Sequence, residues 1–149
     1  MIPTRKHERQ IELRTSPERV FQILHTPSAI RKWWCADRAV VIAKPGGLWV
    51  AAWGPEDDPD YVSAATIRVF DPPRRMLLTD TLYYAKQGQP PFEARMTLDF
   101  IVEPHSRGSL LKVIQDGFPA DRIPDEFYAA CDVGWKKTLE GIRTSVEQM

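Results

Sequence analysis

The sequence predicts an α+β fold, in which a seven-stranded antiparallel sheet wraps around a long C-terminal helix and two short helices follow the first strand. Two helix-start signals occur close together, at Ser16-Pro17 and at Thr26-Pro27. Over 38–117, apolar residues alternate with period two and turn-forming residues interrupt them repeatedly. Over 124–148, apolar residues recur at three- and four-residue steps, which is the period of a helix.

Composition limits the classes of partner. The 149 residues are a usual length for one domain, and a single domain over 1–149 is expected. The 20 lysines and arginines balance the 20 aspartates and glutamates, so neither a nucleic acid nor an anionic membrane is an expected partner. The longest apolar stretch, Leu48 to Trp53, is far shorter than the ~20 residues of a membrane span, and the N-terminus lacks the apolar core of a signal peptide. These features predict a cytoplasmic protein whose cysteines, Cys35 and Cys131, are free thiols.

The N-terminal part contains one strand and two helices. An alternating pattern predicts the first strand over 8–14. Ser16 as the N-cap and Pro17 at the first helical position begin a helix. The apolar side of this helix consists of Val20, Phe21 and Leu24. The second start signal predicts another short helix from Pro27 toward Trp33.

Six further strands follow from the period-two segments between turns. They are predicted over 38–43, 48–54, 61–70, 76–84, 92–103 and 109–117. Because short turns join them, an antiparallel meander is the expected topology.

The last element is a long helix, predicted from about Pro124 to Gln148. Its apolar face consists of Phe127, Cys131, Trp135, Leu139, Ile142 and Val146. At 1.5 Å per residue such a helix spans on the order of 35 Å, which is enough to lie along the whole sheet. The sheet is therefore expected to cover the apolar face of this helix.

Five segments together resemble a known protein family. They are Ser16-Pro17-Glu18-Arg19-Val20-Phe21, Ile30-Arg31-Lys32-Trp33-Trp34, Pro45-Gly46-Gly47-Leu48-Trp49, Val69-Phe70-Asp71-Pro72-Pro73-Arg74-Arg75-Met76 and Gly134-Trp135. In their order along nearly the whole chain they resemble the helix-grip fold of the birch-pollen-allergen and START-type (SRPBCC) superfamily. Within that superfamily, the chain is most similar to the Hsp90 ATPase activator homologue-like proteins.

The resemblance implies a cavity between the concave face of the sheet and the long helix. The superfamily uses this cavity to hold lipids, steroids, polyketides and other apolar molecules. Members of this branch are mostly small bacterial single-domain proteins, and they resemble only the C-terminal domain of the eukaryotic co-chaperone. Chaperone activation depends chiefly on the N-terminal domain of that co-chaperone, for which this chain has no room. The family name therefore does not give the function.

Aromatic residues are the first candidates for a ligand site. Trp49, Ala51 and Trp53 share a face, because residues two apart in a strand point the same way. The resemblance places this row inside, where the small Ala51 leaves space between two indoles. In the competing interpretation, Trp49 and Trp53 are core residues that pack on the helix. Trp34 follows the second helix, at a position suited to line the mouth of a cavity.

Two polar residues are candidates for orienting a ligand. If Lys112 points to solvent, Gln115 faces the cavity. One register of the strand over 76–84 turns Asp80 and Tyr84 inward, whereas the alternative register turns Tyr83 inward and is nearly as apolar. Asp80 on the outer face is thus the competing assignment.

We expect a carrier or sensor that binds a small hydrophobic or aromatic molecule between the sheet and the last helix. The predicted ligand-binding residues are Trp34, Trp49, Trp53, Asp80, Tyr84, Gln115, Phe127 and Trp135. The alternatives are an enzyme of the polyketide cyclase or hydratase type, with Asp80, His25 or Tyr84 moving protons, and an interaction domain for a chaperone or another protein. No catalytic residue, metal or cofactor is assigned, because the sequence shows no nucleophile elbow, phosphate loop or metal-ligand spacing. The predicted strand over 38–43, as an edge strand, would allow a homodimer.

Overall fold

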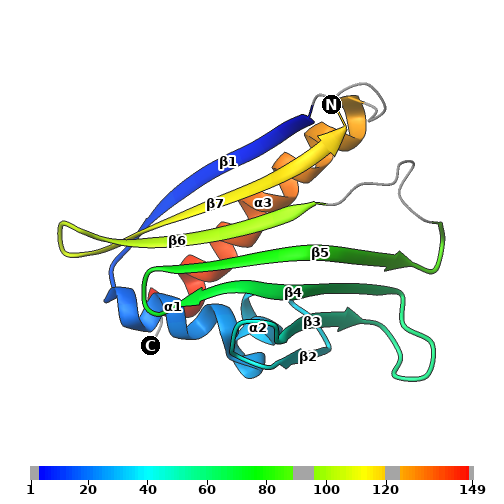
Figure 1. Cartoon of the computed structure of the whole chain (residues 1–149), viewed down its shortest axis with the longest axis horizontal. Coiled ribbons are helices and arrows are strands. Elements are labelled where there is room, and N and C mark those ends of the chain that lie inside the picture. The colour runs from blue at the N-terminus through cyan, green and yellow to red at the C-terminus, as the bar shows by residue number, and fades with distance from the viewer. Residues whose placement is uncertain (1–3, 89–95, 120–124, 148–149) are drawn as a thin grey trace.

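The structure is a computed structural model and describes residues 4–88, 96–119 and 125–147. Seven antiparallel strands form one sheet in the order β1-β7-β6-β5-β4-β3-β2. The strands are β1 (Thr4–Leu13), β2 (Arg38–Val41), β3 (Leu48–Trp53), β4 (Tyr61–Asp71), β5 (Arg75–Ala85), β6 (Thr97–His105) and β7 (Gly108–Pro119). The helices are α1 (Pro17–His25), α2 (Pro27–Trp33) and α3 (Asp125–Glu147). Because α3 runs diagonally across one face of this sheet, the predicted fold class is confirmed (Figure 1).

The two helix-start signals act differently. Ser16 caps α1 as expected, since its Oγ accepts a hydrogen bond from the backbone N–H of Arg19 at 3.2 Å. Thr26 makes no such bond to α2. Its hydroxyl instead donates to the carbonyl of Gln22 at 2.7 Å, and so satisfies one of the last carbonyls of α1. Pro27, with its fixed φ, is then sufficient to begin α2.

The face of the sheet that packs on the helices is called the inner face here, and the opposite one the outer face. Phe100 of β6 lies on the inner face, with its ring centroid 6.4 Å from that of Trp135 in α3. Residues paired across antiparallel strands point to the same side, so the register extends this assignment to all strands. The buried side chains of α3 are Trp135, Leu139, Ile142 and Val146, as the sequence predicts. The side chains of Phe127 and Cys131 lie outside the described residues.

A β-bulge interrupts β5 where it pairs with β4. The register shifts by one residue, so that Asp80 and Thr81 both lie opposite Ala65. Asp80 adopts a φ of 53°, in the left-handed region. Before the bulge, Met76 and Leu78 face inward and are fully buried. After the bulge, the odd-numbered residues of β5 face inward instead of the even-numbered ones.

The bulge decides which way the two tyrosines near the end of β5 point. Tyr83 pairs with Ser63 on the inner face, and Tyr84 pairs with Val62 on the outer face. Asp80 is exposed. Of the two registers that the sequence left open, the one that turns Asp80 and Tyr84 inward is not adopted, because it requires an uninterrupted strand.

Candidate functional site

Indole N–H groups connect α2 and β3 to the end of α1. The last carbonyls of an α-helix have no partner within the helix. Trp33 Nε1 donates to the carbonyl of Ile23, and Trp49 Nε1 donates to that of Leu24, both at 2.9 Å. These bonds pair the indole N–H groups of two buried tryptophans and fix the ring of Trp49 against α1.

All five tryptophans and Phe100 belong to one continuous group of ring contacts. The ring centroid of Trp34 lies 4.9 Å from that of Trp53 and 5.4 Å from that of Trp49. Phe100 lies 6.4 Å from Trp49 on one side and 6.4 Å from Trp135 on the other. Trp49 is only 2% exposed. This part of the inner face is thus filled by side chains, and Trp49 is a core residue.

Gln115 of β7 faces inward beneath α3. Its Oε1 accepts a hydrogen bond from Trp135 Nε1 at 2.7 Å. Its cross-strand partner on β1 is His7, which is 6% exposed. The predicted first strand over 8–14 excludes His7, because the polar residues before Glu8 hide the alternation. A buried histidine next to an inward glutamine is thus a feature that the sequence did not reveal.

Near the turn between β3 and β4, the inner face carries an aromatic strip, which we define as Trp34, Trp53, Tyr61 and Tyr83. Tyr61 is the cross-strand partner of Trp53, so both point inward. The rings of Tyr61 and Tyr83 stack, with centroids 6.3 Å apart and planes at 25°. Tyr61 is 42% exposed and Tyr83 48%, whereas Trp34 and Trp53 are partly buried. At the strip, large aromatic rings of the inner face reach solvent.

Small side chains lie beside the aromatic strip. Ala51 of β3 pairs with Ser63 of β4, and Ser63 pairs with Tyr83. Ala51 is fully buried and Ser63 partly buried.

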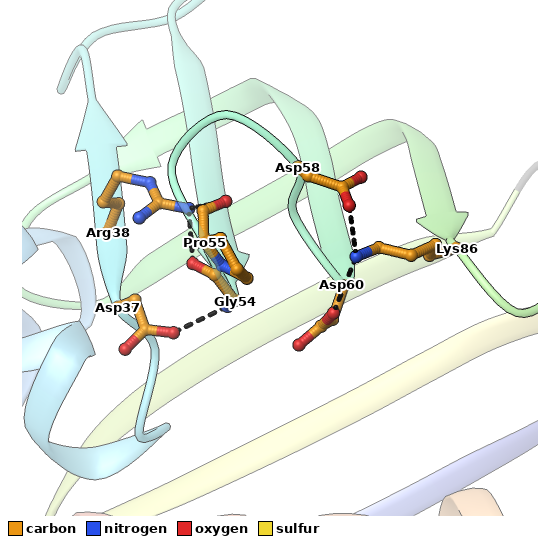
Figure 2. A network of polar contacts seen from close by, with 7 residues as sticks. All are labelled: Asp37, Arg38, Gly54, Pro55, Asp58, Asp60 and Lys86. Atoms are coloured by element: carbon orange, nitrogen blue, oxygen red, sulfur yellow. Dashed lines mark hydrogen bonds and ion pairs between the residues drawn. The ribbon is translucent and has the colours of Figure 1, made fainter.

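A network of polar contacts holds the turn that joins β3 and β4, at one end of the strip (Figure 2). Asp37 Oδ2 accepts a hydrogen bond from the backbone N–H of Gly54 at 2.6 Å. Lys86, just past β5, contacts Asp58 at 2.7 Å and Asp60 at 3.3 Å. The hydrogen bond to Asp58 raises the pKa of Lys86 above its ordinary value. The network thus ties the turn to β2 and β5.

The turn directly flanks two members of the aromatic strip. Trp53 precedes Gly54, and Tyr61 follows Asp60. The backbone N–H of Asp60 donates to the carbonyl of Trp53 at 2.7 Å. Trp53 Nε1 in turn donates to the carbonyl of Trp34 at 3.3 Å, at the end of α2. Hydrogen bonds therefore connect Trp53 both to the β3–β4 turn and to the end of α2.

His25 lies away from the strip. Its ring centroid is 5.3 Å from that of Phe21 and 5.2 Å from that of Phe70, so the imidazole is part of an aromatic group beneath α1. Burial among these rings disfavours the imidazolium and lowers the pKa of His25 below its ordinary value of 6.5. This placement does not suit a proton carrier at the strip.

The lowered pKa of His25 predicts a pH dependence of stability. Between the folded-state pKa and 6.5, the unfolded chain binds more protons than the folded one, so the free energy of unfolding rises with pH in that window. Above this window the stability that depends on a neutral His25 is fully present, and below the window that stability is lost. His25→Gln should therefore flatten the curve of urea midpoint against pH in the acidic range. The other histidines are present in both proteins and contribute equally to both curves. An unchanged slope in the variant would therefore contradict the assignment to His25.

The described residues form grooves away from the aromatic strip, but no metal-ligand group and no membrane-spanning helix. Grooves of about 590 and 560 Å³ lie elsewhere, one between α1, α2 and α3 and one beside the β6–β7 turn. Within residues 4–88, 96–119 and 125–147, no group of three or more histidine, cysteine, aspartate or glutamate side chains is placed to hold a metal ion. Cys35 is a free, exposed thiol. No described helix combines the length and apolar character needed to cross a membrane.

Comparisons with known proteins agree with this architecture. Protein MLL2253 from Mesorhizobium loti superposes with a TM-score of 0.78 at 19% identity, covering 97% of this chain and 98% of that one. An uncharacterised protein from Rhizobium leguminosarum gives a TM-score of 0.79 at 16% identity, covering 100% and 98%. At these identities the likeness shows a shared fold alone, and no curated protein matches significantly.

The family described as "Activator of Hsp90 ATPase homolog 1-like protein" matches residues 14–147, nearly the whole chain. The chain therefore belongs to this family, within the helix-grip fold that its strand order displays.

Proposed function

We propose that this protein binds a small hydrophobic or aromatic molecule on the aromatic strip. The observation that supports the proposal is the exposure of Tyr61 and Tyr83 on the inner face, where neighbouring side chains form the core. Large aromatic rings exposed in a group mark binding surfaces more often than isolated ones do. A fold of a ligand-binding superfamily is consistent with this use. The cytoplasmic location stays a prediction.

The chemistry of the strip favours a ligand with a flat apolar surface. Stacked or edge-to-face aromatic pairs contribute about 0.5 to 1.5 kcal/mol beyond the burial of area. Tyr61 and Tyr83 already stack on each other, so a ligand ring would extend an existing stack rather than create one. Ser63, partly buried between the rings, offers a hydroxyl that can orient one polar group.

Binding without a chemical step is the better supported function. The enzyme alternative needs a proton carrier beside the ligand. Of its three candidates, Asp80 is exposed at the bulge, Tyr84 lies on the outer face, and His25 packs between Phe21 and Phe70. None of the three lies on the aromatic strip.

The test is a titration with three named probes: the flavonoid naringenin, the steroid progesterone and the fatty acid palmitate. Tryptophan fluorescence gives the readout, because Trp34 and Trp53 lie within the strip, and calorimetry confirms each affinity. We expect saturable binding of the flat aromatic probe. The absence of saturable binding by all three probes would contradict the proposal.

Adjacent tyrosines provide a matched pair of variants. Tyr83→Ala removes a ring from the strip and should weaken binding at least ten-fold, equivalent to about 1.4 kcal/mol. Tyr84→Ala removes a ring of similar exposure from the outer face and should leave the affinity unchanged. Equal losses in the two variants would place the ligand elsewhere.

A further inference from the structure

The outer face of the sheet is divided into a charged half and an apolar half. The strands β1, β6 and β7 present charged residues there, with Ile101, Leu110 and Ile114 between them; the charged residues are Glu8, Glu12, Asp99, Glu103 and Lys112. The strands β2 to β5 and the residue after β2 present an outer apolar patch, which we define as Val40, Ile42, Leu48, Val50, Ala64, Leu82 and Tyr84. One face of one sheet thus changes character midway.

The register makes the patch continuous. Val40 pairs with Val50, Val50 with Ala64, and Ala64 with Leu82, so one apolar residue from each of four strands forms a straight row. Leu82 is 73% exposed and Val40 55%. Single exposed apolar residues need no explanation, but a row of them with exposed neighbours on both sides marks a contact surface.

We propose that the outer apolar patch is the contact surface between two copies of this chain, packed face to face about a two-fold axis. A two-fold contact brings the same patch against itself, so the patch must be complementary to itself in charge. No charged residue belongs to the patch. The only charged residue that shares its face on β2 or β3 is Arg38, whose guanidinium donates to the carbonyls of Gly54 and Pro55 at 3.0 and 3.4 Å and is thereby held at the margin.

Charges beside the patch also fit a second copy. Arg68 and Asp80 lie 3.8 Å apart at the surface, on the strands β4 and β5 that carry the patch. A pair with one charge of each sign can meet its own copy with Arg68 facing Asp80, whereas a patch bordered by one sign would repel itself. The whole chain has zero formal charge, so two copies also approach without net repulsion.

The test is the mass of the full chain in solution, measured by sedimentation equilibrium from 1 to 200 µM. We expect a monomer–dimer equilibrium in the wild type, and Leu82→Lys should raise the dissociation constant at least ten-fold. In the monomer this substitution is tolerated, because the side chain is 73% exposed. Val40→Lys provides a second variant in the same row, and thermal melts verify that both are folded.

The matched control is Leu110→Lys, on the charged half of the same face. Leu110 pairs with Glu12 and Glu103, so the new lysine would meet opposite charges and leave the patch intact. We expect the control to dimerise like the wild type. A wild type that stays monomeric throughout the range overturns the proposal, and so does a dimer that survives both patch variants.

Discussion

Trp49→Ala is expected to lower the free energy of unfolding by about 4 kcal/mol, which is within the usual cost of deleting a buried tryptophan ring. The ring is 2% exposed and contacts the rings of Trp33, Trp34 and Phe100. The substitution also leaves the carbonyl of Leu24 without its indole donor. The unpaired acceptor accounts for about 1 to 3 kcal/mol, which is included in the expected loss.

Urea denaturation followed by circular dichroism measures this loss, with Trp53→Ala as the control. Trp53 is on the same face of β3 but only partly buried, and its hydrogen bond to Trp34 is longer, at 3.3 Å. We expect the control to lose about 1 to 2 kcal/mol and to remain folded. A loss below 1 kcal/mol in Trp49→Ala would mean that this ring lines open space rather than filling the core.

Two glycines of α3 are expected to respond in opposite ways to the same substitution. A Cβ at Gly141 would lie 2.5 Å from the carbonyl oxygen of Trp33, so α2 and α3 approach too closely for any side chain. A Cβ at Gly134 would meet no atom within 4 Å. Alanine favours a helix interior over glycine by about 1 kcal/mol, and this gain applies at both positions.

We therefore expect Gly134→Ala to raise the free energy of unfolding by up to about 1 kcal/mol. Gly141→Ala should lower it by about 1 to 3 kcal/mol, because the displacement of α3 from α2 outweighs the gain in helix propensity. Thermal and urea unfolding of the two variants, one beside the other, give the comparison. Stabilisation by both substitutions would contradict the close approach of the two helices.

Most of the element boundaries follow from local signals. Pro27 fixes the start of α2 through its own backbone geometry, and the predicted helix over 27–33 matches α2 (Pro27–Trp33). The apolar spacing of the last helix is equally local, and its described members from Trp135 onward are buried. Such signals need no knowledge of which strands become neighbours.

The register of β5, in contrast, depends on which strand lies beside it. Its two alternations are almost equally apolar, and the choice between them depends on the extra residue at Asp80 and Thr81 opposite β4. No residue type at these positions announces a bulge, because the left-handed φ falls on an aspartate rather than on a glycine. The facing direction of Tyr84 was therefore beyond a rule based on alternation alone.

The candidate site was predictable in part. Trp34 and Trp53 were found from position and pattern, and both lie on the aromatic strip. Tyr61 was missed, although folding β4 back on β3 pairs it with Trp53. Whether Trp49 lines a cavity or fills the core depended on its hydrogen bond to Leu24, a contact 25 residues away that no local pattern contains.

The bulge in β5 has a consequence for changes in the length of the chain. Tyr83 and Tyr84 are chemically identical neighbours, yet one belongs to the aromatic strip and the other to the outer apolar patch. Deletion of the extra residue would remove the bulge and leave Tyr83 opposite Ser63 and Tyr84 opposite Val62, so each tyrosine would keep its surface. A change of length by one residue at this point therefore separates the geometry of the strand from the identity of the two surfaces.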